Sequence, residues 1–219
     1  MGDAAAQRGL MRAFTERQGA FVARLDASER EVVAALVADV AQLLGAPRFD
    51  EVGVPGAPEV PLLRTEPLPA PQDPAVRRLL PDASRDDPEL SAEFRRLTED
   101  DLRAAKVARL GRLWTLLTTP GDGRRHDLLT VTPAAAPDVA AALTDLRLVL
   151  AERLDVRTDA DAERLYDELD DEDGAPGAEV RRYLVALYGA LSWLQESLVG
   201  LLLAHARRGD ASGAATSGG

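Results

Sequence analysis

The chain has 219 residues, of which 46% are hydrophobic and 29% charged, with a formal net charge of -11 and a pI near 4.7. This is the composition of a folded globular protein, with enough residues to bury a real core in one domain. The excess negative charge repels phosphate backbones, so direct nucleic-acid binding is not expected, and the lack of cysteine excludes disulfides, thiolate catalysis and cysteine-based metal or redox sites.

The N-terminal region is predicted to begin with a disordered segment, residues 1–10, followed by a β-hairpin. No apolar stretch of about 7 to 15 residues occurs near the start, as a secretory signal would require, so we expect a cytoplasmic protein. Two short extended runs, residues 12–14 and 20–25, are hinged at Gln18-Gly19 and predict the hairpin.

A first amphipathic helix is predicted from Ser28 to Leu44. The segment 28–31 has the form of a capping box, which satisfies unpaired backbone N–H groups at a helix start, and Gly45 followed by Pro47 predicts the end. Apolar residues recur at intervals of three and four and predict one buried stripe: Val33, Leu36, Val37, Val40, Leu43 and Leu44.

A proline-rich connection, residues 46–87, follows this helix. Ten of the fourteen prolines lie between Pro47 and Pro88, and each removes a backbone donor and fixes φ, so most of this stretch is not expected to be regular. Asp73 and Pro74 provide a cap and a first helical residue, and they predict one short helix that Pro81 ends.

A long helical region is predicted from Pro88 to about Leu117, because Asp87-Pro88 repeats the same start signal. Segment 98–101 has the form of a second capping box and predicts a kink or a fresh start. The first part carries apolar residues at helical spacing, which we expect to join the core: Leu90, Phe94 and Leu97.

Residues 127–132 alternate enough to predict a short strand, and Thr132-Pro133 predicts the start of another helix. A shift of 106 positions superposes this strand and helix on those of residues 25–44, so either a duplicated unit or chance similarity explains the match. Thr158 with Asp161 predicts a short helix through Leu169. The helix after the strand has one apolar face: Val139, Leu143, Leu146, Leu150 and Leu154.

The last helix is predicted to start near Pro176 and to end before a disordered tail, residues 209–219. Residues 183–206 contain one formal charge, Glu196, and are long enough to cross a membrane. Because an acidic side chain near the middle is costly in lipid, we expect a core helix and no membrane association, with a homodimer seam as an alternative. Its heptad-like stripe consists of Val180, Leu184, Leu187, Leu191, Leu194, Leu198 and Leu201.

Motifs that carry chemistry are absent from the sequence. His126 and His205, which we expect at the surface, have no second histidine or carboxylate at metal-ligand spacing. No G-x-S-x-G, Walker or G-x-G-x-x-G pattern occurs. The sequence therefore predicts no catalytic residue, no metal and no cofactor, although an enzyme that uses carboxylates alone stays an alternative. It would need a pocket lined by close carboxylates with raised pKa.

A surface for a protein partner or a second copy is the site that the sequence favours. Arginines between residues 77 and 103 could face a phosphate or an acidic partner, although pairing with neighbouring carboxylates is the simpler interpretation. Trp193 has a large apolar ring that fits a core or an interface anchor. The candidate surface residues are Arg95, Arg96, Arg103, Trp193, Gln195 and Glu196.

Three segments resemble the recurring segments of the AosR-like family of actinobacterial proteins. The first comprises residues 73–89 continued by 93–103, the second residues 143–150 with 153–154, and the third residues 193–198. The family was long carried as a domain of unknown function and came to be described as oxidative-stress transcriptional regulators that act through a partner sigma factor. Sensing through a cysteine pair cannot operate in this chain, because it has no cysteine.

Residues 11–208 are therefore predicted to form a single mainly α domain. We expect an antiparallel helical bundle with a small β-hairpin or short strands near the N-terminus and around 127–132. The resemblance implies a cytoplasmic regulator that binds a sigma factor or another transcription protein. The alternative hypothesis is a structural or adaptor protein without a direct transcriptional role. Both hypotheses place the function in protein contacts and not in catalysis.

Overall fold

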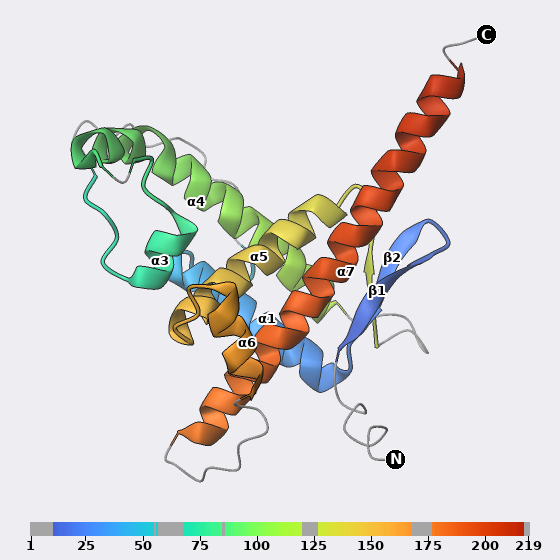
Figure 1. The fold of residues 1–219 in the computed structure, drawn as a ribbon, viewed down its shortest axis with the longest axis horizontal. Helices are drawn as coiled ribbons and strands as arrows, with labels where there is room; N and C mark the ends of the chain where they lie inside the picture. The colour runs from blue at the N-terminus through green and yellow to red at the C-terminus, as the bar shows by residue number, and fades with distance from the viewer. Residues whose placement is uncertain are drawn as a thin grey trace.

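Four long helices and a three-stranded antiparallel sheet form the fold (Figure 1). The computed structural model describes residues 11–54, 56, 68–84, 86–119, 127–167 and 177–216. The predicted mainly α class with a small β element is confirmed. His126 and the predicted disordered segment 1–10 lie outside the described residues.

The sheet has the order β1-β2-β3, with β1 at Arg12–Arg17, β2 at Ala20–Arg24 and β3 at Leu128–Val131. Gln18 and Gly19 both have positive φ, 52° and 77°, which is the backbone of a tight hairpin turn, and they confirm the predicted hinge. The inner face of the sheet packs into the core through Phe14, Phe21, Ala23, Leu129 and Val131.

Helix α1 (Ala27–Leu43) begins one residue earlier than predicted because Asp26 is its N-cap. The Asp26 carboxylate accepts from the Glu29 backbone N–H, and the Glu29 carboxylate accepts from the Asp26 N–H, both at 2.8 Å. The capping box therefore joins Asp26 to Glu29, and its assignment to Ser28 and Glu31 was wrong. The predicted helix itself is confirmed.

The proline-rich connection contains two short helices, α2 (Phe49–Val52) and α3 (Pro74–Leu79). Asp73 caps α3 by accepting from the Ala75 N–H at 2.8 Å, as the sequence predicted. Helix α2 was not predicted. It buries Phe49, whose ring lies edge-on to Trp114 with the centroids 6.1 Å apart.

Helix α4 (Pro88–Thr118) is continuous, so a fresh start at residues 98–101, one of the two predicted alternatives, is wrong. The Thr98 hydroxyl donates to the Phe94 carbonyl oxygen at 2.8 Å, which is a bond within the helix and not a cap. Glu99 pairs with Arg103 one turn further along. Both side chains are bonded within the helix and cap no new one, although the second carboxylate oxygen of Glu99, Oε2, is buried without a hydrogen-bond partner.

Helices α5 (Ala136–Arg153), α6 (Asp159–Asp167) and α7 (Ala178–Thr216) complete the chain. Long helices α1 and α4, α4 and α5, and α5 and α7 pack against each other. In Figure 1, α1 and α4 run in opposite directions, as do α5 and α7, whereas α4 and α5 cross. The strands of the two strand–helix units, β2–α1 and β3–α5, are neighbours in the sheet, where Phe21 pairs with Val131. Helix α7 continues past Gly209, where the sequence predicts a disordered tail, since propagating an existing helix needs little intrinsic propensity.

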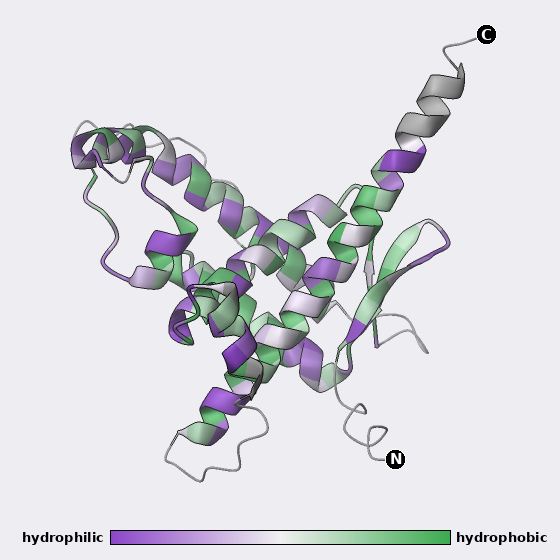
Figure 2. Cartoon of the chain, viewed as in Figure 1, coloured by the Kyte–Doolittle hydropathy of each residue, from purple (hydrophilic) through white to green (hydrophobic). Residues whose placement is uncertain are grey.

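Helix α7 places its leucine stripe in the core. Leu187, Leu191 and Leu198 are buried, while Figure 2 shows hydrophilic residues towards the described end of the helix. The stretch Ala178–Gly209 is long and apolar enough to cross a membrane by length and composition, and it passes that test as core helices of soluble proteins also do.

Candidate functional site

The N-terminal half of α4 buries polar side chains and exposes apolar ones. Ser91, Arg95 and Glu99 follow one another at four-residue intervals, and their exposed fractions are 1%, 8% and 4%. A helix that packs by hydrophobic burial has the opposite arrangement. This half of α4 is therefore held by hydrogen bonds and ion pairs on its inner side.

The buried polar side chains fasten the proline-rich connection to the helix. The Ser91 hydroxyl accepts from the Ser84 N–H at 3.1 Å and donates to the Ser84 carbonyl at 2.9 Å. Arg95 donates from Nε to the Leu68 carbonyl oxygen at 3.0 Å and also pairs with Asp82. Ser91 and Arg95 thereby replace the water that they lose on burial, and residues on both sides of α3 are joined to α4.

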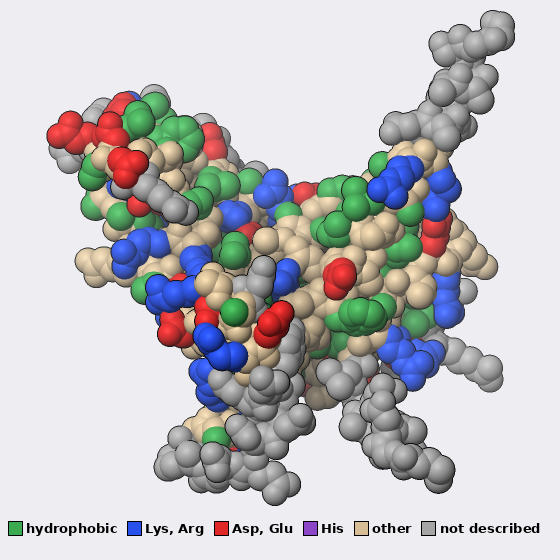
Figure 3. Space-filling view, in the orientation of Figure 1, with side chains coloured by type: hydrophobic (Ala, Val, Ile, Leu, Met, Phe, Trp, Pro, Cys, Tyr) green, Lys and Arg blue, Asp and Glu red, His purple; other side chains and the backbone are tan. Residues whose placement is uncertain are grey.

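The outer side of the same helix is apolar. Leu90, Phe94 and Leu97 are 54%, 50% and 61% exposed, and their spacing of four and three residues makes them one continuous row, here called the α4 apolar stripe. Figure 3 shows hydrophobic side chains at the surface over this end of α4, beside acidic ones. The prediction that these residues would join the core was wrong.

The three predicted arginines of α4 are paired within the chain. Arg95 is buried, so it does not contribute to an exposed surface. Arg96 donates to Glu93 at 2.6 Å and lowers the pKa of that carboxyl, and Arg103 donates to Glu99 at 2.7 Å. Pairing with neighbouring carboxylates, the simpler interpretation of this charged segment, describes all three.

The predicted residues of α7 divide between an internal contact and the surface. Gln195 accepts from Arg147 and donates to Thr144, so it joins α7 to α5. Trp193, 57% exposed, and Glu196 lie at the surface. The α4 and α7 groups do not form one site, because α5 packs between the two helices.

One buried ion pair connects α4 to α5. The chain's single lysine, Lys106, lies with Nζ 2.5 Å from Asp145 Oδ1, and the other carboxylate oxygen, Oδ2, is buried without a hydrogen-bond partner. Burial raises the pKa of Asp145, and the hydrogen bond from Lys106 offsets part of that rise. The sequence carried no signal for this pair, because the two residues are far apart in the chain.

Two observations bear on metal binding and on cavities in the described part of the chain. Within the described part of the chain, no group of three or more histidine or carboxylate side chains could hold a metal ion. A cavity of about 530 Å³ lies between α1 and α4, with Ala34, Ala38 and Trp114 in its wall and Glu31 and Asp50 also lining it. The Asp50 carboxylate is bonded to Arg48.

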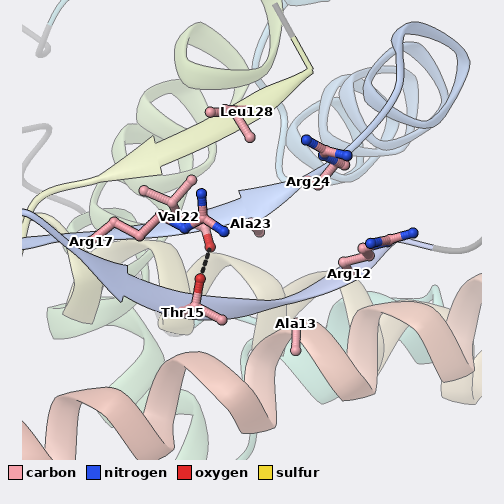
Figure 4. A pocket seen from close by; sticks show the side chains of 8 residues that line it. All are labelled: Arg12, Ala13, Thr15, Arg17, Val22, Ala23, Arg24 and Leu128. Atoms are coloured by element: carbon pink, nitrogen blue, oxygen red, sulfur yellow. Dashed lines mark hydrogen bonds between the residues drawn. The ribbon is translucent and has the colours of Figure 1, made fainter. Parts of the chain in front are cut away.

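A further feature lies on the outer face of the hairpin, where Arg12, Arg17 and Arg24 line a cavity of about 310 Å³ (Figure 4). Strict alternation along β1 would place Arg12 and Arg17, which are five positions apart, on opposite faces of the hairpin. The register shift between Arg12 and Thr15 brings both to the face of Arg24, so the sequence pattern alone did not identify this group.

Comparison with known proteins identifies a family and no individual relative. No curated protein and no solved structure matches the chain. The sequence model of a family described as a domain of unknown function, DUF2017, matches residues 11–202. That range includes the sheet, α1 to α6 and the packed part of α7, and the chain accordingly belongs to the DUF2017 family.

Proposed function

We propose that this protein is a cytoplasmic regulator that acts by binding another protein, and that it is an AosR-like transcriptional regulator whose partner is a sigma factor. The observation that carries the proposal is the α4 apolar stripe. The AosR-like resemblance supplies the class of partner, and its first segment, residues 73–89 continued by 93–103, contains α3 and two residues of the stripe, Phe94 and Leu97.

The α4 apolar stripe has the form of a helix that docks in a groove. Anchors at positions i, i+4 and i+7 are the usual pattern for such binding. Full burial of a leucine or phenylalanine side chain contributes roughly 1.5 to 3 kcal/mol, and about half of each side chain is exposed here. A partner that covers Leu90, Phe94 and Leu97 would gain a substantial part of that energy.

The inner contacts of α4 support the same function. Because Arg95 and Ser91 hold the helix in place through Asp82, Leu68 and Ser84, the stripe is presented on a fixed surface. A preformed surface avoids the entropy cost of ordering on binding. Any oxidative signal must reach the protein by a route other than thiol oxidation, since cysteine is absent.

The test is a titration of the purified full chain against purified sigma factors of the source organism, measured by isothermal calorimetry. The variant L90S/F94S/L97S should weaken binding at least about tenfold, which corresponds to roughly 1.4 kcal/mol. The matched control V180S/Y183S/L203S changes three exposed apolar residues of α7, 65%, 51% and 54% exposed, and should bind within about twofold of the unaltered chain.

The outcomes separate the candidate functions. A sigma factor that binds the control and not the α4 variant supports the proposal. Loss of binding in the control alone would move the interface to α7. Failure of every sigma factor to bind the unaltered chain would contradict the transcriptional role and favour the alternative of an adaptor protein.

A further inference from the structure

The outer face of the sheet is cationic in a protein of net charge -11. The cavity of about 310 Å³ on this face is lined by Arg12, Thr15, Arg17, Val22, Arg24 and Leu128, among others. Figure 4 shows Arg12 and Arg24 at one end of the hairpin, and the Arg17 side chain running along it towards Val22. Three guanidinium groups thus border one shallow, partly apolar depression.

The arrangement of these arginines costs stability in the isolated chain. Arg12 and Arg24 are directly opposite each other across β1 and β2, and like charges in that position repel. Arg24 has one carboxylate partner, Asp127 at 3.0 Å. Among the residues that the structure describes, no ion pair is formed by Arg12 or by Arg17. An anion bound between them would relieve the repulsion.

The depression also has the dimensions of an extended peptide. Arg12 and Arg17 are five positions apart along β1, which at about 3.3 Å per residue places their backbones at most about 16 Å apart. Two acidic residues four positions apart in an extended segment lie on one face and span about 13 Å, a distance that the long arginine side chains can match. Val22 and Leu128 line the depression between these ends and suit an apolar side chain of such a segment.

We infer that the hairpin binds an acidic peptide segment of a partner protein, in which carboxylates meet Arg12, Arg17 and Arg24 and an apolar side chain contacts Val22. Arginine suits this role because its planar fork binds carboxylates in a bidentate manner. The site lies on a different surface from the α4 apolar stripe and does not depend on the proposed function.

A peptide fits this face better than a nucleic acid does. A nucleic-acid strand extends well beyond the depression, and its phosphates would meet the field of a chain with net charge -11. At physiological salt, charges more than about 8 Å apart are largely screened from each other. Most of a segment of about ten residues lies within that distance of the three arginines, so their positive charge outweighs the negative charge of the rest of the chain.

The experiment measures binding of a fluorescein-labelled peptide of about ten residues to the full chain by fluorescence anisotropy. Glutamate, valine and glutamate occupy every second position of the peptide, with serine between them, so that they share one face of an extended segment. In the variant R12Q/R17Q the affinity should fall about tenfold, because two unshared charged contacts are removed. Raising the salt from about 50 to 300 mM should weaken binding to the unaltered chain.

The matched control is R157Q/R164Q, which makes the same change in net charge at two exposed arginines near and on α6. It should bind the acidic peptide within about twofold of the unaltered chain. Equal losses in both variants, or no binding of the peptide to the unaltered chain, would overturn the inference. Tighter binding of a ten-nucleotide oligothymidylate than of the peptide would also overturn it.

The variant L90S/F94S/L97S distinguishes this site from the proposed function. It should retain full affinity for the acidic peptide even where it no longer binds a sigma factor. Loss of peptide binding in that variant, with an unchanged melting temperature, would show that the hairpin is not the peptide site.

Discussion

Arg30 of α1 donates from Nε to the carbonyl oxygen of Leu117, 2.9 Å away, near the end of α4. The same guanidinium also bonds the carbonyl oxygens of Leu116, Thr119 and Leu128 at 2.7, 3.0 and 3.2 Å. A helix leaves its last carbonyl groups without partners, and a cation at that end is favourable. One buried arginine therefore joins α1, α4 and β3.

Replacing Arg30 should destabilise the protein strongly. In Arg30→Met the apolar stem is kept while the last carbonyls of α4 lose their donor, and we expect a loss of about 3 kcal/mol in the free energy of unfolding. Urea denaturation followed by circular dichroism measures it. Arg112→Met removes an exposed pair with Asp138 and should cost less than about 1 kcal/mol, so equal losses would refute the capping role.

The Lys106–Asp145 pair should behave as a coupled unit. Lys106→Met leaves the Asp145 carboxylate buried without its partner and should cost about 3 to 5 kcal/mol near neutral pH. The double variant K106M/D145L removes both charges and should recover much of that loss. A double-mutant cycle by urea denaturation checks this, and strictly additive losses would show that the two side chains are not coupled.

The raised pKa of Asp145 predicts a specific pH dependence. Because the folded-state pKa lies above the unfolded value of about 3.9, the folded protein binds the proton more tightly. The contribution of Asp145 to the free energy of unfolding is greatest at low pH, and it declines as the pH rises from about 4 through the folded-state pKa. The free energy of unfolding of the unaltered chain minus that of Asp145→Asn should therefore fall over this interval, and a rising difference would contradict the assignment.

The two sides of α7 should respond differently to truncation. Leu191 is fully buried, so Leu191→Ala leaves a cavity and should cost about 3 kcal/mol. Trp193 lies on the exposed side, so Trp193→Ala should lower the free energy of unfolding by less than about 1 kcal/mol. Thermal and urea unfolding of the two variants measure the contrast. A larger loss at Trp193 would mean that the helix packs through its other face.

The cap of α1 can be assigned by a pair of alanine substitutions. Asp26→Ala removes the acceptor of the Glu29 N–H and should cost about 1 kcal/mol. Ser28→Ala, two residues away within the first turn, should change the free energy of unfolding by less than about 0.5 kcal/mol. The reverse order would restore the assignment that the sequence favoured.

Local signals in the sequence predicted most of the secondary structure. Gln18-Gly19 placed the hairpin, Asp73-Pro74 placed α3, and the leucine spacing of α7 identified its buried side. Each of these is a property of a few consecutive residues or of one helix face, so it does not depend on the rest of the fold.

The features that the sequence did not predict depend on contacts between distant segments. The stripe of Leu90, Phe94 and Leu97 has the spacing of a core face, and only the contacts of Arg95 and Ser91 with the proline-rich connection turn that face outward. Arg30 likewise gives no local sign that it reaches residues 116–128. Side-chain spacing defines a face of a helix but not which neighbour it meets.

Contacts with helices also cover part of both edge strands of the small sheet, β1 and β3. At β1 the Phe14 N–H donates to the Ser197 hydroxyl of α7 at 2.9 Å, and at β3 the Leu128 carbonyl accepts from Arg30. Edge strands with unpaired backbone N–H and C=O groups can pair with strands of other molecules and start aggregation. With these positions occupied, a hairpin that would be aggregation-prone by itself is kept from growing into an intermolecular sheet.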